Sequence, residues 1–142
     1  MKNIILSAAL IFSLSLIACG NAKTNSENSS STSEIDQTPS VKTLEQKELA
    51  QKIADKKVIV IDVRTPGEVA DGYIKGADKF LNVNNASFES EILKLDKKAT
   101  YVMYCRSGAR SGRAASFMVA NGFEDVYNLA GGIMSYTGEK AK

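Results

Sequence analysis

The 142-residue sequence contains no histidine, and this absence excludes several classes of site. Ser-His-Asp hydrolases, Cys-His proteases and histidine-ligated zinc centres all depend on an imidazole. A nucleophile in this chain must therefore be activated by backbone N–H groups, a helix dipole and fixed charges. We expect neither a metal site nor a cofactor.

The chain also carries little net charge. Its 18 Lys and Arg residues nearly balance its 16 Asp and Glu residues, which leaves a formal charge of +2. A surface that binds nucleic acid normally shows a large excess of Lys and Arg. We therefore expect no nucleic-acid partner.

A short apolar run from Ile4 to Ile17 lies close to the start of the sequence, behind one lysine. It is too short for a transmembrane helix and is typical of a secretory signal peptide. The residues from Leu16 to Cys19 resemble a bacterial lipobox, in which the cysteine is lipidated and becomes the new N-terminus. We expect a signal peptide over residues 1–18 and a lipid on Cys19, which would anchor the protein to a membrane of the bacterial cell envelope. An ordinary signal peptide is the alternative.

Residues 19–40 are dominated by Asn, Ser and Thr and contain few apolar side chains, so they cannot bury a core. They predict a lipid-anchored flexible linker that spans about 25 Å on average. Residues 41–142 are enough for one domain with a modest core. Lipidation of Cys19 would leave Cys105 as the only free thiol of the mature protein.

Segments with strand and helix patterns alternate along residues 41–142. Strands are predicted at 58–61, 80–83, 101–104 and 125–129, and helices through Leu44, Leu49 and Ile53, through Phe88, Ile92 and Leu95, and over 114–119. This alternation indicates an α/β fold, with a small, mainly parallel sheet flanked by helices on both faces.

The segment Cys105–Ser111 places a lone thiol between a predicted strand and a predicted helix. Lowering a thiol pKa from about 8.5 to about 6 requires roughly 3.4 kcal/mol, whereas a helix dipole supplies at most about 2 kcal/mol. We expect the rest from backbone N–H groups, in a turn that Gly108 helps to form, and from Arg106 and Arg110. A buried cysteine with only a packing role is the alternative.

Four segments together resemble single-domain rhodaneses, a family of sulfurtransferases. They are residues 61–68 (IDVRTPGE), 72–77 (GYIKGA), 105–111 (CRSGARS) and 128–133 (NLAGGI), and their order and spacing also agree with the family. The resemblance covers roughly residues 41–138. It implies that Cys105 takes sulfane sulfur from a small anionic donor such as thiosulfate and holds it as a persulfide. The sulfur then passes to a thiol or cyanide, or to a protein thiol partner.

The resemblance also implies roles for the residues around Cys105. Loop N–H groups would cradle the charge on the transferred sulfur, and two arginines would attract the donor; the substrate-binding residues are Arg106, Ser107, Gly108, Ala109, Arg110 and Ser111. Asp62, Arg64 and Glu68 follow the strand at 58–61, at the edge where open α/β sheets bind ligands. We expect Arg64 to pair with Asp62 or Glu68, and all three residues to support the site without touching the sulfur.

Two positions depart from the family pattern. Tyr73 stands where the family commonly has histidine, and Tyr136 where it commonly has tryptophan. A phenol keeps an aromatic ring with a hydrogen-bonding tip, so packing and tethering roles can survive both changes.

Two other functions stay open for the cysteine loop. A non-enzymatic sulfur- or thiol-binding module would keep the loop but lack efficient turnover. A Cys-dependent phosphatase is the second, although such enzymes separate cysteine and arginine by five residues, whereas four residues separate Cys105 from Arg110. The shorter loop makes a smaller ring of N–H groups, which fits one sulfur atom better than a phosphoryl group.

Overall fold

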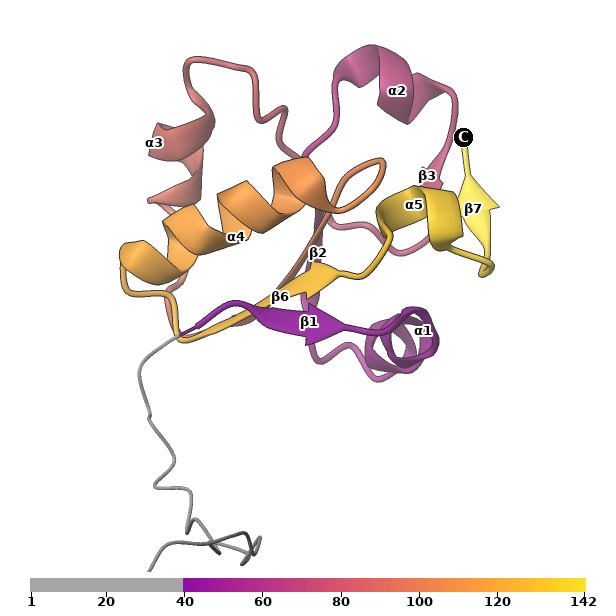
Figure 1. Cartoon of the computed structure of the whole chain (residues 1–142), viewed down its shortest axis with the longest axis horizontal. Coiled ribbons are helices and arrows are strands. Elements are labelled where there is room, and N and C mark those ends of the chain that lie inside the picture. The colour runs from indigo at the N-terminus through magenta and orange to yellow at the C-terminus, as the bar shows by residue number, and fades with distance from the viewer. Residues whose placement is uncertain (1–39) are drawn as a thin grey trace, which may run out of the picture. The chain divides into compact units, whose positions relative to one another are not determined.

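The computed structural model describes residues 40–142 (Figure 1). Its elements, in chain order, are β1 (Lys42–Leu44), α1 (Gln46–Ala54), β2 (Ile59–Asp62), α2 (Pro66–Ala70), β3 (Tyr73–Ile74), β4 (Lys79–Phe80), α3 (Phe88–Ile92), β5 (Thr100–Tyr104), α4 (Ala109–Ala120), β6 (Asp125–Leu129), α5 (Gly132–Ser135) and β7 (Lys140–Ala141). The predicted signal peptide, the predicted lipid site at Cys19 and the predicted linker up to residue 39 lie outside the described residues. Within residues 40–142, no helix is long and apolar enough to cross a membrane.

Five strands form one sheet in the order β1-β6-β5-β2-β4, and every neighbouring pair is parallel. β3 and β7 form a separate antiparallel pair. In a parallel sheet all carboxyl ends lie at one edge, so the residues that follow β2, β5 and β6 meet there. The predicted α/β fold with a mainly parallel sheet is confirmed.

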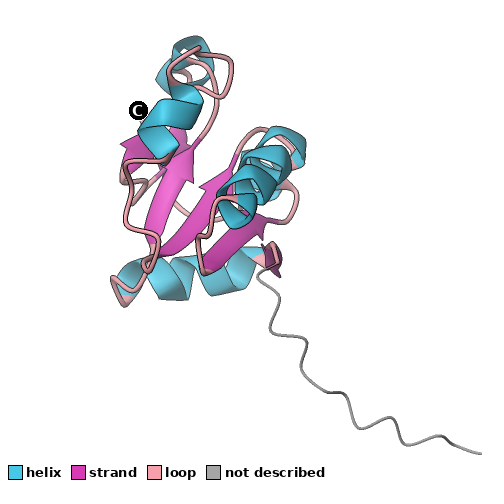
Figure 2. Ribbon diagram, turned by 90° about the vertical axis from the view of Figure 1, so that its left-hand side faces the viewer, coloured by secondary structure: helices cyan, strands magenta, loops and turns pink. Residues whose placement is uncertain are grey.

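Helices cover both faces of this sheet (Figure 2). Alternate residues of β5 point to opposite faces: Tyr101 and Met103 pack with residues of α3 and α4, whereas Val102 and Tyr104 pack with residues of α1 and α5. All four side chains are at most 1% exposed. Burial on both faces explains why the central strand has an almost continuous apolar sequence.

Several boundaries differ from the sequence prediction. Leu44 belongs to β1 rather than to the helix that contains Leu49, because residues 42–44 pair with β6. The strand predicted at 80–83 is only Lys79–Phe80, where it pairs with β2. Leu95 lies beyond the end of α3 but still packs against the core. In each case tertiary pairing or packing, rather than local periodicity, sets the boundary.

The two tyrosines that depart from the family pattern both pack against other residues. The Tyr73 ring meets the Phe80 ring edge-on, with 4.9 Å between ring centroids. Tyr136 follows α5 and is only 7% exposed. It packs in the part of the core that lies on the α1 side of the sheet. The packing role expected of both tyrosines is therefore visible in the fold.

Candidate active site

Cys105 lies directly after β5, and α4 begins four residues later. Its side chain is 1% exposed. Gly108 has a φ of 99°, a conformation that favours glycine, and its N–H donates to Cys105 Sγ at 3.2 Å. The Ser111 hydroxyl, from the first turn of α4, lies 3.5 Å from the same sulfur. The loop therefore folds its donors around the thiol.

These donors change the acidity of the thiol. Burial alone would raise the pKa of Cys105, but hydrogen bonds from the Ser111 hydroxyl and from the N–H groups of Ser111, Gly108 and Ser107 outweigh it and leave the pKa below its usual value. The thiolate is the nucleophilic form of cysteine. A lowered pKa therefore makes Cys105 a stronger candidate nucleophile at neutral pH than an ordinary buried cysteine.

The carbonyl groups of the loop are tied to α5. The N–H groups of Ile133 and Met134, in the first turn of α5, donate to the carbonyl oxygens of Cys105 and Arg106 at 2.9 and 3.0 Å. This contact requires a close approach at Gly132, where a Cβ atom would lie 2.5 Å from the Cys105 oxygen. With these two carbonyls held by α5, the loop can direct N–H groups to the sulfur.

Asn128, in β6, connects the loop to α4 by two hydrogen bonds. Its Nδ2 donates to the Gly108 carbonyl at 3.1 Å, and its Oδ1 accepts from the Ser111 hydroxyl at 2.7 Å. Ser111 has only one hydroxyl proton, so its 3.5 Å contact with Cys105 competes with this bond to Asn128 and with a 3.1 Å bond to the Gly108 carbonyl. Sequence reasoning gave Asn128 and Gly132 no role, although an asparagine inside a strand and paired glycines after it are unusual enough to indicate one.

Arg64 and Asp62 form a buried ion pair, with 2.6 Å between Nη2 and Oδ2. The guanidinium also donates to the backbone carbonyls of Glu68 and Gly72, at 3.1 and 2.8 Å. Of the two partners expected for Arg64, the structure therefore selects Asp62. Arg64 therefore ties the end of β2 to the middle of α2, at Glu68, and to Gly72, which follows that helix.

Glu68 instead pairs with Arg110. Two hydrogen bonds of 2.6 and 2.8 Å join the guanidinium to the carboxylate. This bond, with help from the Thr65 backbone and hydroxyl, lowers the pKa of Glu68 to about 2. The pKa of Arg110 is raised, first by Glu68 and to a smaller extent by the Cys105 thiolate. The charge of Arg110 is therefore largely balanced by Glu68.

The other predicted loop residues are spread between core and surface. Gly108 and Ser111 are buried, whereas Arg106, Ser107 and Ala109 are exposed. Arg106 forms no ion pair with any residue in the described part of the chain. It is thus the loop arginine whose charge is available to an incoming anion.

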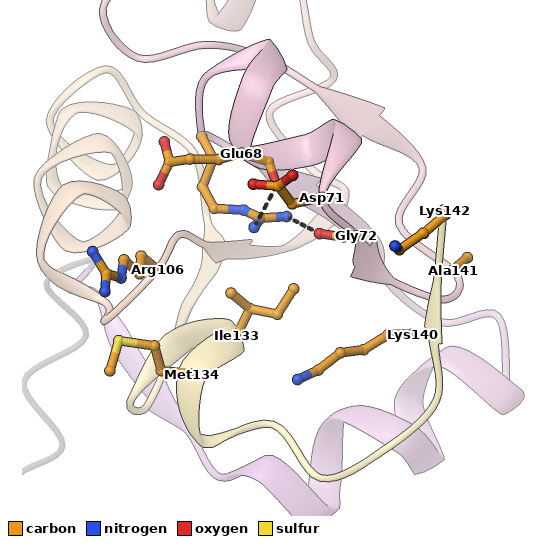
Figure 3. Close-up of a pocket in the computed structure, with 10 residues that line it drawn as sticks. Glu68, Asp71, Gly72, Arg106, Ile133, Met134, Lys140, Ala141 and Lys142 are labelled. Atoms are coloured by element: carbon orange, nitrogen blue, oxygen red, sulfur yellow. Dashed lines mark hydrogen bonds between the residues drawn. The ribbon is translucent and has the colours of Figure 1, made fainter.

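A cleft of about 630 Å³ adjoins the loop at Arg106 (Figure 3). It is lined by Arg64, Glu68, Asp71, Gly72, Arg106, Ile133, Met134, Lys140, Ala141 and Lys142. These residues come from the end of β2, from α2, from α5 and from β7, so the cleft lies between segments that are far apart in the sequence. The geometry combines a thiol surrounded by hydrogen-bond donors with an adjoining cleft that carries charged side chains.

A comparison with family models matches residues 45–139 to the rhodanese-like domain. The chain belongs to the rhodanese-like domain family. The match includes β2, the cysteine loop, α4 and the Asn128–Ile133 segment, so it covers every contact of Cys105 described above.

Relatives include enzymes of more than one kind. The chain is 39% identical over 85 residues to the thiosulfate sulfurtransferase GlpE of Pseudomonas fluorescens, a match that covers 60% of this chain and 75% of that protein. It is 42% identical over 92 residues to a tRNA uridine(34) hydroxylase of Acaryochloris marina, which covers 61% of this chain but only 29% of the hydroxylase. Among solved structures, a rhodanese-like domain protein from Staphylococcus aureus is similar, with a TM-score of 0.61, 31% identity, and coverage of 70% of this chain and 94% of that one.

Proposed function

We propose that the protein is a sulfurtransferase that carries sulfane sulfur on Cys105. The observation that carries the proposal is the buried thiol at the end of β5, to whose sulfur the Gly108 N–H donates at 3.2 Å. The hydrogen bonds of the loop also lower the pKa of this thiol. The Cys105 thiolate would attack the outer sulfur of thiosulfate, form a new S–S bond and release sulfite. An acceptor thiolate or cyanide would then attack the terminal sulfur and return the electron pair of the breaking S–S bond to Cys105.

The N–H groups of the cysteine loop are arranged to stabilise a sulfur atom that carries one negative charge. The N–H groups that now stabilise the thiolate lie where they can also stabilise charge on the sulfur that becomes attached to it. Arg106, which is exposed and unpaired among the described residues, would attract the anionic donor. Arg110, held by Glu68, is less free to bind the oxygens of a phosphoryl group. These features favour sulfur transfer over phosphate hydrolysis.

A turnover assay separates the three candidate functions. With thiosulfate and cyanide, we expect steady formation of thiocyanate at a rate proportional to enzyme concentration, and we expect no phosphate release from an aryl phosphate. Sulfur uptake without thiocyanate formation would instead identify a binding module. Phosphate release without thiocyanate would contradict the proposal and support the phosphatase.

We further propose that the domain is attached to a membrane of the bacterial cell envelope by a lipid on Cys19. The support is the Leu16–Cys19 pattern behind an apolar run. Acyl chains contribute about 0.8 kcal/mol per buried CH₂, and two or more chains give stable attachment. When expressed in a bacterial host, the wild-type protein should sediment with membranes, whereas Cys19→Ser should be released or remain unprocessed. A soluble wild-type protein with an unmodified N-terminus would exclude the lipid anchor.

A further inference from the structure

The Ser111 hydroxyl lies within reach of three acceptors. Its Oγ is 2.7 Å from Asn128 Oδ1, 3.1 Å from the Gly108 carbonyl oxygen and 3.5 Å from Cys105 Sγ. A serine side chain has one O–H group to donate. The acceptor that receives this proton therefore decides how far Ser111 stabilises a thiolate at Cys105.

Asn128 removes one of these acceptors from the competition. The Gly108 carbonyl oxygen has two lone pairs, and it already accepts from the Gly112 N–H at 2.9 Å and from Asn128 Nδ2 at 3.1 Å. The same contact fixes the orientation of the side-chain amide, because a flipped amide would place Oδ1 against the Gly108 oxygen. Two acceptors are left for the Ser111 proton, Asn128 Oδ1 and Cys105 Sγ.

We infer that Asn128 is a positioning residue that holds the Ser111 proton while Cys105 Sγ is neutral and releases it to the sulfur when a thiolate forms. Neutral sulfur is a weak acceptor, so the amide oxygen at 2.7 Å keeps the proton. Hydrogen bonds to a charged acceptor are about twice as strong as neutral ones, so the hydroxyl turns to a thiolate. Because the bond to Asn128 must then break, Ser111 stabilises the thiolate less than it would without Asn128.

This exchange affects both halves of sulfur transfer, a consequence that rests on the proposed function. In the Cys105 persulfide, Sγ is bonded to the terminal sulfur and is neutral, so Asn128 holds the Ser111 proton. An acceptor thiolate or cyanide forms a bond to the terminal sulfur, the S–S bond breaks, and its electron pair returns to Sγ, to which the hydroxyl then donates. A more stable thiolate leaves faster but attacks more slowly. Asn128 therefore sets the balance between loading and discharge.

The charged groups around the sulfur come from several elements. Arg110, in α4, interacts with the thiolate, and Glu68, in α2, balances its charge. At the end of β2, Asp62 and Arg64 pair with each other, and Arg106 of the loop is exposed. α5 has no charged residue, and the charged residue of β6 lies at the amino end of that strand. None of these residues is changed in the variants described below.

The test is a double-mutant cycle on the acidity of Cys105, measured by the pH dependence of its alkylation by iodoacetamide and followed by the mass of the peptide that contains it. Asn128→Leu removes the amide at nearly constant volume, and Ser111→Ala removes the hydroxyl. In Asn128→Leu the Gly108 oxygen, at 3.1 Å from Ser111 Oγ, is a weaker competitor than the amide oxygen at 2.7 Å. We expect Asn128→Leu to lower the thiol pKa by about 0.5 unit, about a threefold rise in the thiolate-to-thiol ratio. In the Ser111→Ala background it should have no such effect.

Asn128→Asp provides a second cycle with the opposite sign. A carboxylate accepts from Ser111 more strongly than an amide does, so the rise in the pKa of Cys105 should be larger with the Ser111 hydroxyl than in the Ser111→Ala background. Asn121→Leu makes the same substitution as Asn128→Leu at the far end of α4 and should leave the acidity of Cys105 unchanged. Thermal unfolding checks that each variant is folded.

Discharge of the persulfide by cyanide tests the use of this exchange in transfer. Asn128→Leu should discharge about twofold faster than wild type, and the difference should disappear in the Ser111→Ala background. Equal pKa shifts with and without the Ser111 hydroxyl would overturn the inference, as would a pKa that rises in Asn128→Leu or a discharge rate that does not change. Wild-type enzyme that takes up no sulfur would refute the proposed function, whereas the alkylation cycles would still decide whether Asn128 holds the Ser111 proton.

Discussion

Cys105→Ser is expected to abolish sulfur transfer and to leave the fold intact. The serine hydroxyl is nearly isosteric with the thiol but stays protonated at neutral pH, even among the donors that lower the thiol pKa. Because every transfer step passes through the sulfur of residue 105, thiocyanate formation should fall to the uncatalysed rate. The measurement is turnover with thiosulfate and cyanide at enzyme concentrations high enough to detect about a thousandth of wild-type activity.

The matching structural control is the thermal unfolding of Cys105→Ser. Cys105 is 1% exposed, and the Gly108 N–H that donates to its sulfur can also donate to a hydroxyl oxygen. We therefore expect cooperative unfolding and a change in stability of no more than about 2 kcal/mol. Sulfur transfer retained by a folded Cys105→Ser protein would refute the role of this residue.

Gly132→Ala is expected to have the second-largest effect, although Gly132 makes no contact with the sulfur. Its φ of 57° is unfavourable for alanine, and the new Cβ would lie 2.5 and 2.6 Å from the carbonyl oxygens of Cys105 and Arg106. Relieving this clash must move the loop away from α5. We expect about a hundredfold loss of transfer rate, comparable to the loss of one oxyanion-hole donor, and about 2–4 kcal/mol of destabilisation.

Substitutions at two other glycines serve as controls for Gly132→Ala. Gly122 also has a positive φ, of 85°, but its Cβ would meet only the flexible end of Lys97 at 4.0 Å, whereas a Cβ at Gly67 would meet nothing within 4 Å. Gly122→Ala should therefore lose stability without a comparable loss of activity, and Gly67→Ala, in α2, should lose neither activity nor stability. If Gly132→Ala lost no more activity than Gly122→Ala, the proposed support of the loop by α5 would be wrong.

Local sequence patterns were sufficient for the centre of the fold. The strand that ends at Tyr104, the helix that contains residues 114–119 and the strand over residues 125–129 all appear in the structure, because each has enough apolar residues to show its period. Cys105 follows the first of these elements and precedes the second. Its position at the carboxyl edge of the sheet could therefore be predicted as well. That position follows from the order of a parallel α/β fold.

The short elements and the supports of the loop could not be predicted in the same way. β1, β3 and β7 have two or three residues each and exist through their pairing partners. The pairing of Glu68 with Arg110, 42 residues further along the sequence, depends on how α2 packs beside the loop, and it leaves Asp62 as the partner of Arg64. Asn128 is 20 residues from Gly108 in the sequence and meets it only through the fold. Such contacts are tertiary, and no local pattern encodes them.

Intact mass after incubation with thiosulfate tests the central claim most directly. The proposal predicts a gain of about 32 Da on the wild-type domain, one sulfur atom on the thiolate nucleophile, and its loss when a thiol or cyanide is added. Cys105→Ser should show no gain under the same conditions. A wild-type protein of unchanged mass, or an equal gain on Cys105→Ser, would contradict sulfur transfer through a Cys105 persulfide.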